Sequence, residues 1–222
     1  MRGSGPARWH PPGPWPVLLR FDTGLTSEDY VSREAWRKAS LPYCPNHRQG
    51  GCSLSRHGTY ERKTPPGTRI ARWYCRESHT TFNLLPDCLA ARLPGTLQTL
   101  EQAVVVAEQA PSLETAAAVL RPGIELPGAL RWLRRRRRYV QHTLIVVIGL
   151  LPELLGGCAP TITAVRSRLG QDAVLTHLRG RAASYLPALS APLGFSSLLA
   201  VAGDVDRRHQ QPMGPDPPAS AA

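Results

Sequence analysis

Four potential metal ligands, arranged as two pairs, constrain the fold of this chain more than any other feature. Cys44 and Cys52 bound the segment CPNHRQGGC, and Cys75 and His79 bound CRESH. A hairpin-like stretch separates the inner members of the two pairs. Two ligand pairs on tight turns, joined by a hairpin, can build a closed tetrahedral zinc site. We therefore predict a small zinc ribbon whose Zn²⁺ ligands are Cys44, Cys52, Cys75 and His79.

The spacing within each pair leaves alternative ligands open. The two pairs read C-x7-C and C-x3-H, which are looser than the CxxC pairs of most zinc ribbons. His47 competes as a partner of Cys44, and Cys88 competes on the other side of the hairpin. A domain of about 40 residues has too little core to fold alone. Metal binding would therefore supply much of the folding free energy.

The segments around these ligands resemble a known family. CP…C, HGTYERK and RWYC…TTFNLLP are similar to the zinc-ribbon N-terminal head of bacterial insertion-sequence transposases and related transposase-like proteins. The resemblance covers residues 43 to about 93, and more weakly the region to about 140. It implies a role in DNA recognition, with metal ligands at Cys44, Cys52, Cys75 and His79. The chain departs from the family pattern in its last knuckle, which usually ends in Cys.

The charge of the chain favours a nucleic-acid partner. Its formal net charge is +11, and all basic residues except Lys38 and Lys63 are arginine. Arginine forks pair well with phosphate groups and with guanine edges. A GC-rich genome that raises Arg, Ala and Pro together would give the same composition without nucleic-acid binding. We predict duplex DNA as the partner, and a homodimer is a further possibility.

The periodicity of the sequence predicts an α+β, mostly α fold with disordered ends. A helix is expected over residues 26–39, capped by Thr26 or Ser27, and helical spacing begins at 95. The expected regions are a disordered leader at 1–25, a short helix plus zinc ribbon at 26–93, a helix-turn-helix-like domain at 95–142, a helical region at 143–200 and a disordered tail at 203–222.

An arginine-rich segment is predicted to form the third helix of the helix-turn-helix-like domain. Leu130, Leu133 and Val140 share one face of that helix, so the opposite face can enter a major groove. Residues early in such a helix reach base edges, and later ones bind phosphate. We expect base contacts from Arg131 and Arg134. The full set of expected nucleic-acid-binding residues is Arg131, Arg134, Arg135, Arg136 and Arg138.

Several other functions are disfavoured by the sequence. The most apolar run, at 144–155, is interrupted by Pro152 and Glu153, so it is expected to be a buried helix and not a membrane anchor. Five cysteines without a preceding secretory segment indicate free thiols in a reducing, cytoplasmic compartment. The chain has no recognisable catalytic motif, and few acidic residues follow residue 140. We therefore expect a recognition protein and not an enzyme.

Two alternative functions remain open. In the first, the ribbon and apolar helices bind another protein, and the arginines serve only solubility. In the second, the ribbon binds RNA and stacks bases on Trp73 and Tyr74.

Overall fold

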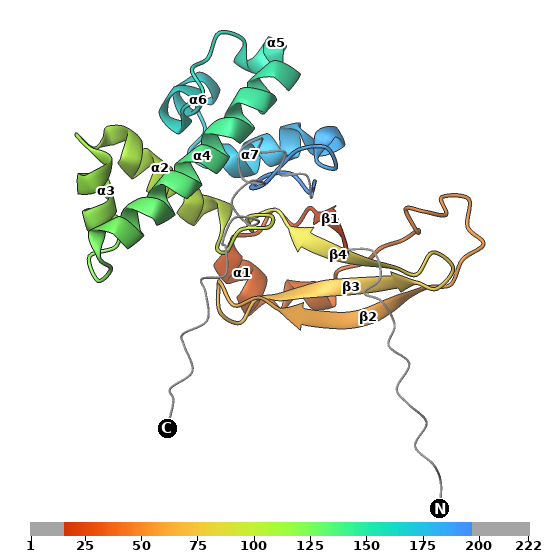
Figure 1. The fold of residues 1–222 in the computed structure, drawn as a ribbon. Coiled ribbons are helices and arrows are strands. Elements are labelled where there is room, and N and C mark those ends of the chain that lie inside the picture. The colour runs from red at the N-terminus through yellow and green to blue at the C-terminus, as the bar shows by residue number, and fades with distance from the viewer. Residues whose placement is uncertain (1–15, 197–222) are drawn as a thin grey trace, which may run out of the picture.

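The computed structural model describes residues 16–196, which form a four-stranded sheet and seven α-helices. The helices α2–α7 gather on one side of the molecule, and the loop that leads into β2 projects at the far end from them (Figure 1). The α+β class is therefore confirmed. The tail expected at 203–222 and residues 1–15 of the expected leader lie outside the described residues. The strands are β1 (Val17–Phe21), β2 (Leu54–Glu61), β3 (Arg69–Cys75) and β4 (Thr80–Pro86).

The sheet is larger than the hairpin that the sequence predicted. Its strand order is β1-β4-β3-β2, with β2, β3 and β4 antiparallel and β1 parallel to β4. The expectation of a disordered leader to residue 25 is wrong from residue 17 onward. Because Leu18 and Leu19 pair with Asn83 and Leu84 in the middle of β4, this short segment completes the edge of the sheet. Such long-range parallel pairing has no local sequence signal.

The helix expected at 26–39 forms in two pieces. Helix α1 spans Ser27–Ser32, and its N-cap Thr26 accepts a hydrogen bond from the Asp29 backbone N–H at 3.1 Å, as predicted. Glu34 then adopts a left-handed conformation with φ +45°, which ends the helix. A 3₁₀ turn, η1, follows at Ala35–Arg37.

The helical region is organised around one long helix. Helix α2 begins close to residue 95, where helical spacing was predicted to begin. The side chains of Thr96 and Ser112 accept hydrogen bonds from backbone N–H groups at the starts of α2 and α3. Helix α4, however, runs unbroken through the boundary expected at residues 142–143. The bounds are α2 (Leu97–Gln109), α3 (Leu113–Leu120), α4 (Leu126–Leu150), α5 (Pro152–Leu155), α6 (Ile162–Leu169), α7 (Val174–Arg181) and the 3₁₀ turn η2 (Ala183–Tyr185).

The second half of α4 is a core element. Leu144 and Val147 are fully buried, although Ile145 between them is 54% exposed. None of the helices within residues 16–196 combines the length and the apolar character that a membrane crossing requires. This result agrees with the prediction of a core helix.

Two carboxylates of α2 hold the last helices in place. Glu101, only 3% exposed, accepts hydrogen bonds from the backbone N–H groups of Val174 and Leu175 at the start of α7. Two helical turns farther along α2, Glu108 accepts hydrogen bonds from the N–H groups of Ile162 and Thr163 at the start of α6. Negative side chains at helix N-termini satisfy unpaired N–H groups and complement the helix dipole.

The sheet and the helices share one continuous hydrophobic core. It includes Leu84 and Leu85 of β4, Leu100 of α2, Leu144 of α4 and Leu178 of α7. The regions predicted at 26–93, 95–142 and 143–200 therefore share this core. Two small satellite clusters lie outside it, one between α2, α3 and α4 and one around Cys44, Cys75 and Phe82.

A buried arginine closes this core at the end of β4. Arg179 of α7 is 0% exposed and donates to the carbonyl groups of Asp87 (3.1 Å), Pro192 (2.6 Å) and Leu193 (3.1 Å), among others. Burial lowers the pKa of Arg179 to about 10, so the side chain stays charged at neutral pH. Backbone carbonyls thus take the place that water or a carboxylate would otherwise fill.

Candidate metal centre and arginine-rich helix

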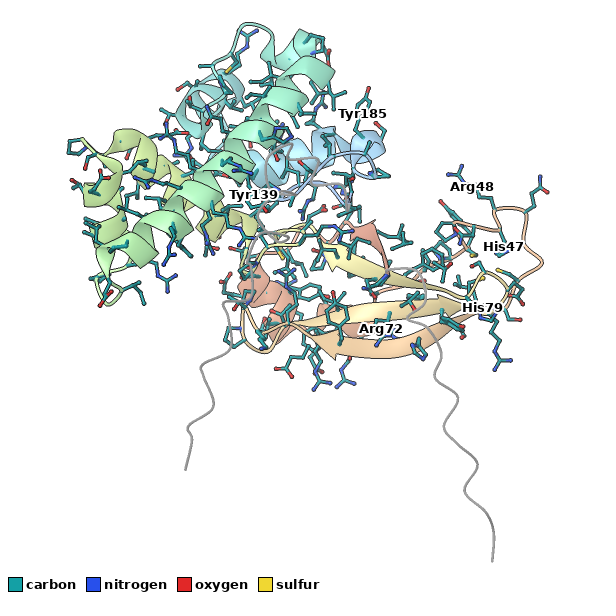
Figure 2. All side chains as sticks on the ribbon, viewed as in Figure 1. His47, Arg48, Arg72, His79, Tyr139 and Tyr185 are labelled. Atoms are coloured by element: carbon teal, nitrogen blue, oxygen red, sulfur yellow. The ribbon has the colours of Figure 1, made fainter. Side chains whose placement is uncertain are left out.

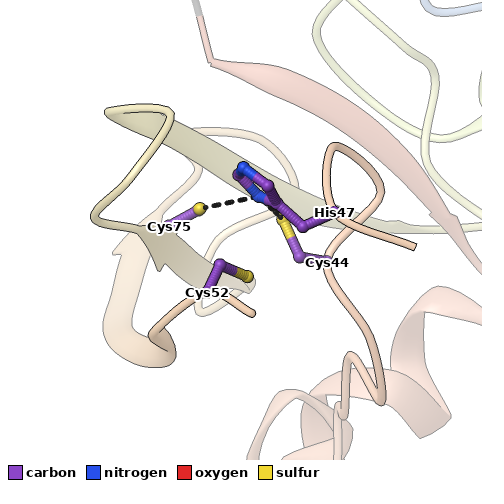
Figure 3. A group of neighbouring side chains, drawn as sticks. All are labelled: Cys44, His47, Cys52 and Cys75. Carbon is purple, nitrogen blue, oxygen red and sulfur yellow. Dashed lines mark hydrogen bonds between the residues drawn. The ribbon is translucent and has the colours of Figure 1, made fainter. Parts of the chain in front are cut away.

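Three cysteines and one histidine converge at the end of the sheet farthest from the helices (Figure 3). The ligand atoms of Cys44, His47, Cys52 and Cys75 all lie within 4.8 Å of one another. His47 Nδ1 is 3.4 Å from Cys44 Sγ and 3.5 Å from Cys75 Sγ. Three of the four predicted ligands are therefore together, and these four donors can hold a metal ion.

The distances fit a tetrahedral zinc ion. Zn–S bonds of about 2.3 Å and Zn–N bonds of about 2.0–2.1 Å at tetrahedral angles place sulfur and nitrogen about 3.6 Å apart. The two sulfur–nitrogen distances at His47 are 3.4 and 3.5 Å. Three thiolates and one imidazole are a frequent donor set of structural zinc sites. A zinc ion here would be held by side chains alone and would act as a structural cross-link.

A tight turn places the first two ligands side by side. In the segment Cys44-Pro45-Asn46-His47, the His47 N–H donates to the Cys44 carbonyl at 3.1 Å. Proline at the second position and asparagine at the third suit such a turn. The turn brings the imidazole back over the first thiol.

Hydrogen bonds join the three segments that carry the ligands. Asn46 Nδ2 donates to Ser78 Oγ at 3.1 Å and to Thr80 Oγ1 at 3.2 Å, which ties the first turn to the connection between β3 and β4. Glu77 Oε2 accepts from the Ser53 N–H at 2.8 Å and lies 3.6 Å from Cys75 Sγ. Contacts of this kind orient metal ligands.

The apolar support of the cluster is small. Its buried residues are Cys44, Cys75 and Phe82, so two of the three are ligands themselves. Apart from the hydrogen bonds of Asn46 and Glu77 and a few partly buried side chains, little would hold the loop before β2 against the sheet without a cross-link.

The environment of Cys75 favours its thiolate. Burial disfavours the charged form, but hydrogen bonds from Ser78 and from the neighbouring thiols Cys44 and Cys52 outweigh it and lower the pKa of Cys75 to about 7. Burial and the neighbouring thiols of Cys44 and Cys75 raise the pKa of Cys52. A metal ion binds thiolates, so it would displace protons from this cluster.

His79 is not part of the cluster, and His47 occupies the fourth position in its place. His79 lies in the turn between β3 and β4 with φ +49°, and its Nδ1 is 3.1 Å from the Tyr74 hydroxyl. Tyr74 and Cys75 are consecutive on a strand, so their side chains point to opposite faces of the sheet. His79 contacts Tyr74 and therefore lies on the face away from Cys75. Figure 2 shows His47 and His79 at this end of the sheet. The sequence signal for His47 was its C-x2-H spacing. Cys88, the other competing residue, is buried beyond β4 in the main core.

The arginines of α4 divide into a solvent face and a buried edge. Arg131, Arg134, Arg135 and Arg138 are exposed, while Ala129, Leu133 and Val140 are buried on the opposite side. The exposed set has the spacing i, i+3, i+4, i+7, which is one helix face. Arg134 Nη2 lies 3.6 Å from Glu114 Oε1 of α3, and both side chains are more than half exposed, so this ion pair is weak.

Arg136 lies off this face. Its guanidinium sits 4.0 Å from the ring centroid of Trp132. Burial, together with the charges of Arg121 and Arg135, lowers the pKa of Arg136 to about 10. Arg136 was predicted to bind nucleic acid, but this cation–π contact directs its side chain toward Trp132 on the same helix.

Trp73 and Tyr74 cannot stack bases side by side. They occupy opposite faces of β3, and Trp73 packs against the cluster of Cys44, Cys75 and Phe82 with its Nε1 buried. Of the two, Tyr74 alone faces away from the metal centre.

Comparison with known proteins identifies no relative of this chain. No known protein family, no curated protein and no solved structure matches the chain.

Proposed function

We propose that this protein binds duplex DNA through the arginine face of α4, with a zinc ion at the Cys/His cluster ordering the end of the sheet. The observation that carries the proposal is the exposed face formed by Arg131, Arg134, Arg135 and Arg138. Within residues 16–196, one weak ion pair, to Glu114, offsets these four charges. Such a row of uncompensated guanidinium groups suits the phosphate backbone of nucleic acid.

The anchoring of α4 supports this role. Its opposite face is fixed by Leu133 against α2 and α3, and farther along by Leu144 in the main core. A rigid helix presents its charges in a fixed register, which favours specific contacts over diffuse attraction. In this proposal Arg131 and Arg134, nearest the start of the helix, contact base edges, and Arg135 and Arg138 contact phosphate.

We also propose that the chain is related to the zinc-ribbon heads of transposases. Its support is the sequence resemblance around the cysteines, together with a Cys/His cluster that can hold a metal ion. We propose a recognition protein without a catalytic centre of its own.

The proposal is tested by replacing Arg131, Arg134, Arg135 and Arg138 with alanine and measuring duplex DNA binding by fluorescence anisotropy between 50 and 200 mM salt. The two phosphate contacts assigned to Arg135 and Arg138 predict a slope of log K against log salt of about −1.8 for the native chain. The quadruple variant should lose most of this slope. A native isotherm that does not respond to salt would contradict the proposal.

A matched control separates the arginine face from net charge. Four exposed arginines lie away from α4: Arg33 directly after α1, Arg37 on η1, Arg69 on β3 and Arg76 in the turn after β3. Their replacement by alanine removes the same four charges without altering α4. This control should retain the native salt slope, and equal losses in both variants would reduce the effect to overall charge.

Protein binding is a second candidate function, and one surface favours it. Val119, Ile124 and Leu126, at the connection between α3 and α4, are 68%, 46% and 43% exposed. Exposed apolar residues that gather in this way mark protein contact sites. If the alanine variant of the arginine face keeps its binding partners, this candidate gains over DNA binding.

A further inference from the structure

A groove crosses the face of the sheet opposite the Cys/His cluster. Along β3, Cys75 points to the cluster, so Arg72 points to the other face (Figure 2). Asn83 of β4 lies beside Arg72 in the register. Two cavities of about 370 and 420 Å³ open on this face and share Pro16, Tyr60 and Asn83 as lining residues, so they adjoin. Each has the size of a small-molecule site.

The charge of the groove is positive throughout. Arg62, Lys63 and Arg92 line the first cavity, and Arg72 lines the second. Among the described residues, no Asp or Glu lines either cavity. A groove with charges of one sign attracts ligands of the opposite sign.

Two of these cations are free to bind a ligand. Arg62 already donates to the carbonyls of Ala90 and Leu93, and Arg92 donates to that of Phe195. The side chains of Arg72 and Lys63 make no hydrogen bond or ion pair with any residue between 16 and 196. The groove therefore offers one guanidinium and one ammonium group, both suited to phosphate.

An unpaired amide lies at the floor of the groove. Asn83 is 5% exposed and lines both cavities, yet its Oδ1 has no hydrogen-bond partner within the described chain. A buried polar atom without a partner is costly unless a ligand or water satisfies it. An amide carries an acceptor and a donor side by side, which matches the edge of a nucleobase.

Tyr60 provides the aromatic surface between the two cavities. It is half-buried and lines both of them. Bases stack on such rings in proteins that bind unpaired nucleotides, next to basic side chains that hold the phosphates. The groove thus combines an aromatic ring, an amide and free cations on one face.

The geometry points to a binding site for a nucleoside phosphate, with the base against Tyr60 and Asn83 and the phosphate on Arg72. The ligand is either a free nucleotide or an unpaired nucleotide of a nucleic-acid strand. In the second case Lys63, at the other end of the groove, would meet a neighbouring phosphate. This site does not depend on the DNA-binding face of α4.

The test is calorimetric titration of the full chain with nucleoside monophosphates, with inorganic phosphate and with an unpaired oligonucleotide. We expect the nucleotides to bind more tightly than phosphate, because phosphate lacks the contacts to Tyr60 and Asn83. Arg72→Ala should weaken nucleotide binding about tenfold or more, through loss of a charge-assisted hydrogen bond. Arg72→Lys, which keeps the charge, should lose less than Arg72→Ala.

Further variants separate the possible outcomes. Asn83→Leu should weaken binding of nucleotides but not of phosphate, and Lys63→Ala should weaken the oligonucleotide more than the monophosphate. Arg138→Ala, on α4, is the control and should leave nucleotide binding unchanged even where it weakens duplex binding. Absence of nucleotide binding, equal affinity for phosphate and nucleotides, or full binding by a folded Arg72→Ala variant would overturn the proposal.

Discussion

The two ends of the β3–β4 pair are held by different chemistry. At the end of β4, Arg179 and the main hydrophobic core fix the chain through burial and hydrogen bonds to carbonyl groups. At the turn between the strands, Cys44, Cys75 and Phe82 supply the only buried apolar support among the described residues, and four potential metal ligands meet there. The first end is held by burial and hydrogen bonds, whereas we expect the second to gain its stability from a metal cross-link.

Replacing Arg179 should have the largest effect on stability. Arg179→Met leaves several buried carbonyl groups without a donor, and each unsatisfied group costs about 1–3 kcal/mol. We expect a loss of more than about 3 kcal/mol in the free energy of unfolding, measured by urea denaturation. Arg181→Ala, an exposed site on the same helix, is the control and should change stability by less than about 0.5 kcal/mol. Native-like stability of Arg179→Met would contradict its role.

A smaller loss is expected at Glu101, which also belongs to the metal-independent end. Glu101→Gln removes the charge that pairs with Arg166 at 2.8 Å and that caps α7. We expect a loss of about 2 kcal/mol in unfolding free energy, within the range for hydrogen bonds to charged groups. The loss should be the same with and without a chelator, and a chelator-dependent loss would show that the two ends are coupled.

The next effect should appear only at the metal end. Glu77→Ala removes the acceptor that joins the Ser53 N–H to the side of Cys75. Loss of such an orienting contact lowers metal affinity by about 10- to 100-fold, as measured by competition with a chromophoric chelator. Glu61→Ala, an exposed acid on β2, is the matched control. Equal affinities in the two variants would contradict an orienting role.

The smallest effect is expected at His79. His79→Ala removes one exposed hydrogen bond, to Tyr74, so unfolding free energy should change by less than about 0.5 kcal/mol and metal content should stay the same. Loss of the metal in this variant would indicate that His79, as the sequence alone predicted, is a ligand in place of His47.

Much of the fold could be predicted from local patterns. The cap at Thr26 and the onset of helical spacing at residue 95 both depend on near neighbours, and both predictions were confirmed. The edge strand β1 was missed because its partner is about 65 residues away in sequence. The predicted boundary inside α4 was wrong because no helix breaker lies near residue 142.

The candidate site shows the same limit. Spacing alone brought Cys44, Cys52 and Cys75 together, but it could not decide between His47 and His79. That choice depends on the face of the sheet to which each side chain points, and the positive φ of His79 has no clear sequence signal. The groove of Tyr60, Arg72 and Asn83 was also missed, since it joins residues from three strands.

Metal content of the purified chain tests the central claim most directly. We predict one zinc ion per chain by elemental analysis, retained in His79→Ala and lost or strongly reduced in Cys75→Ser and His47→Ala. In the two depleted variants, amide protection should fall over residues 44–54 and remain in α2 and α4. A native chain without bound metal, or full zinc content in a folded Cys75→Ser variant, would contradict the account.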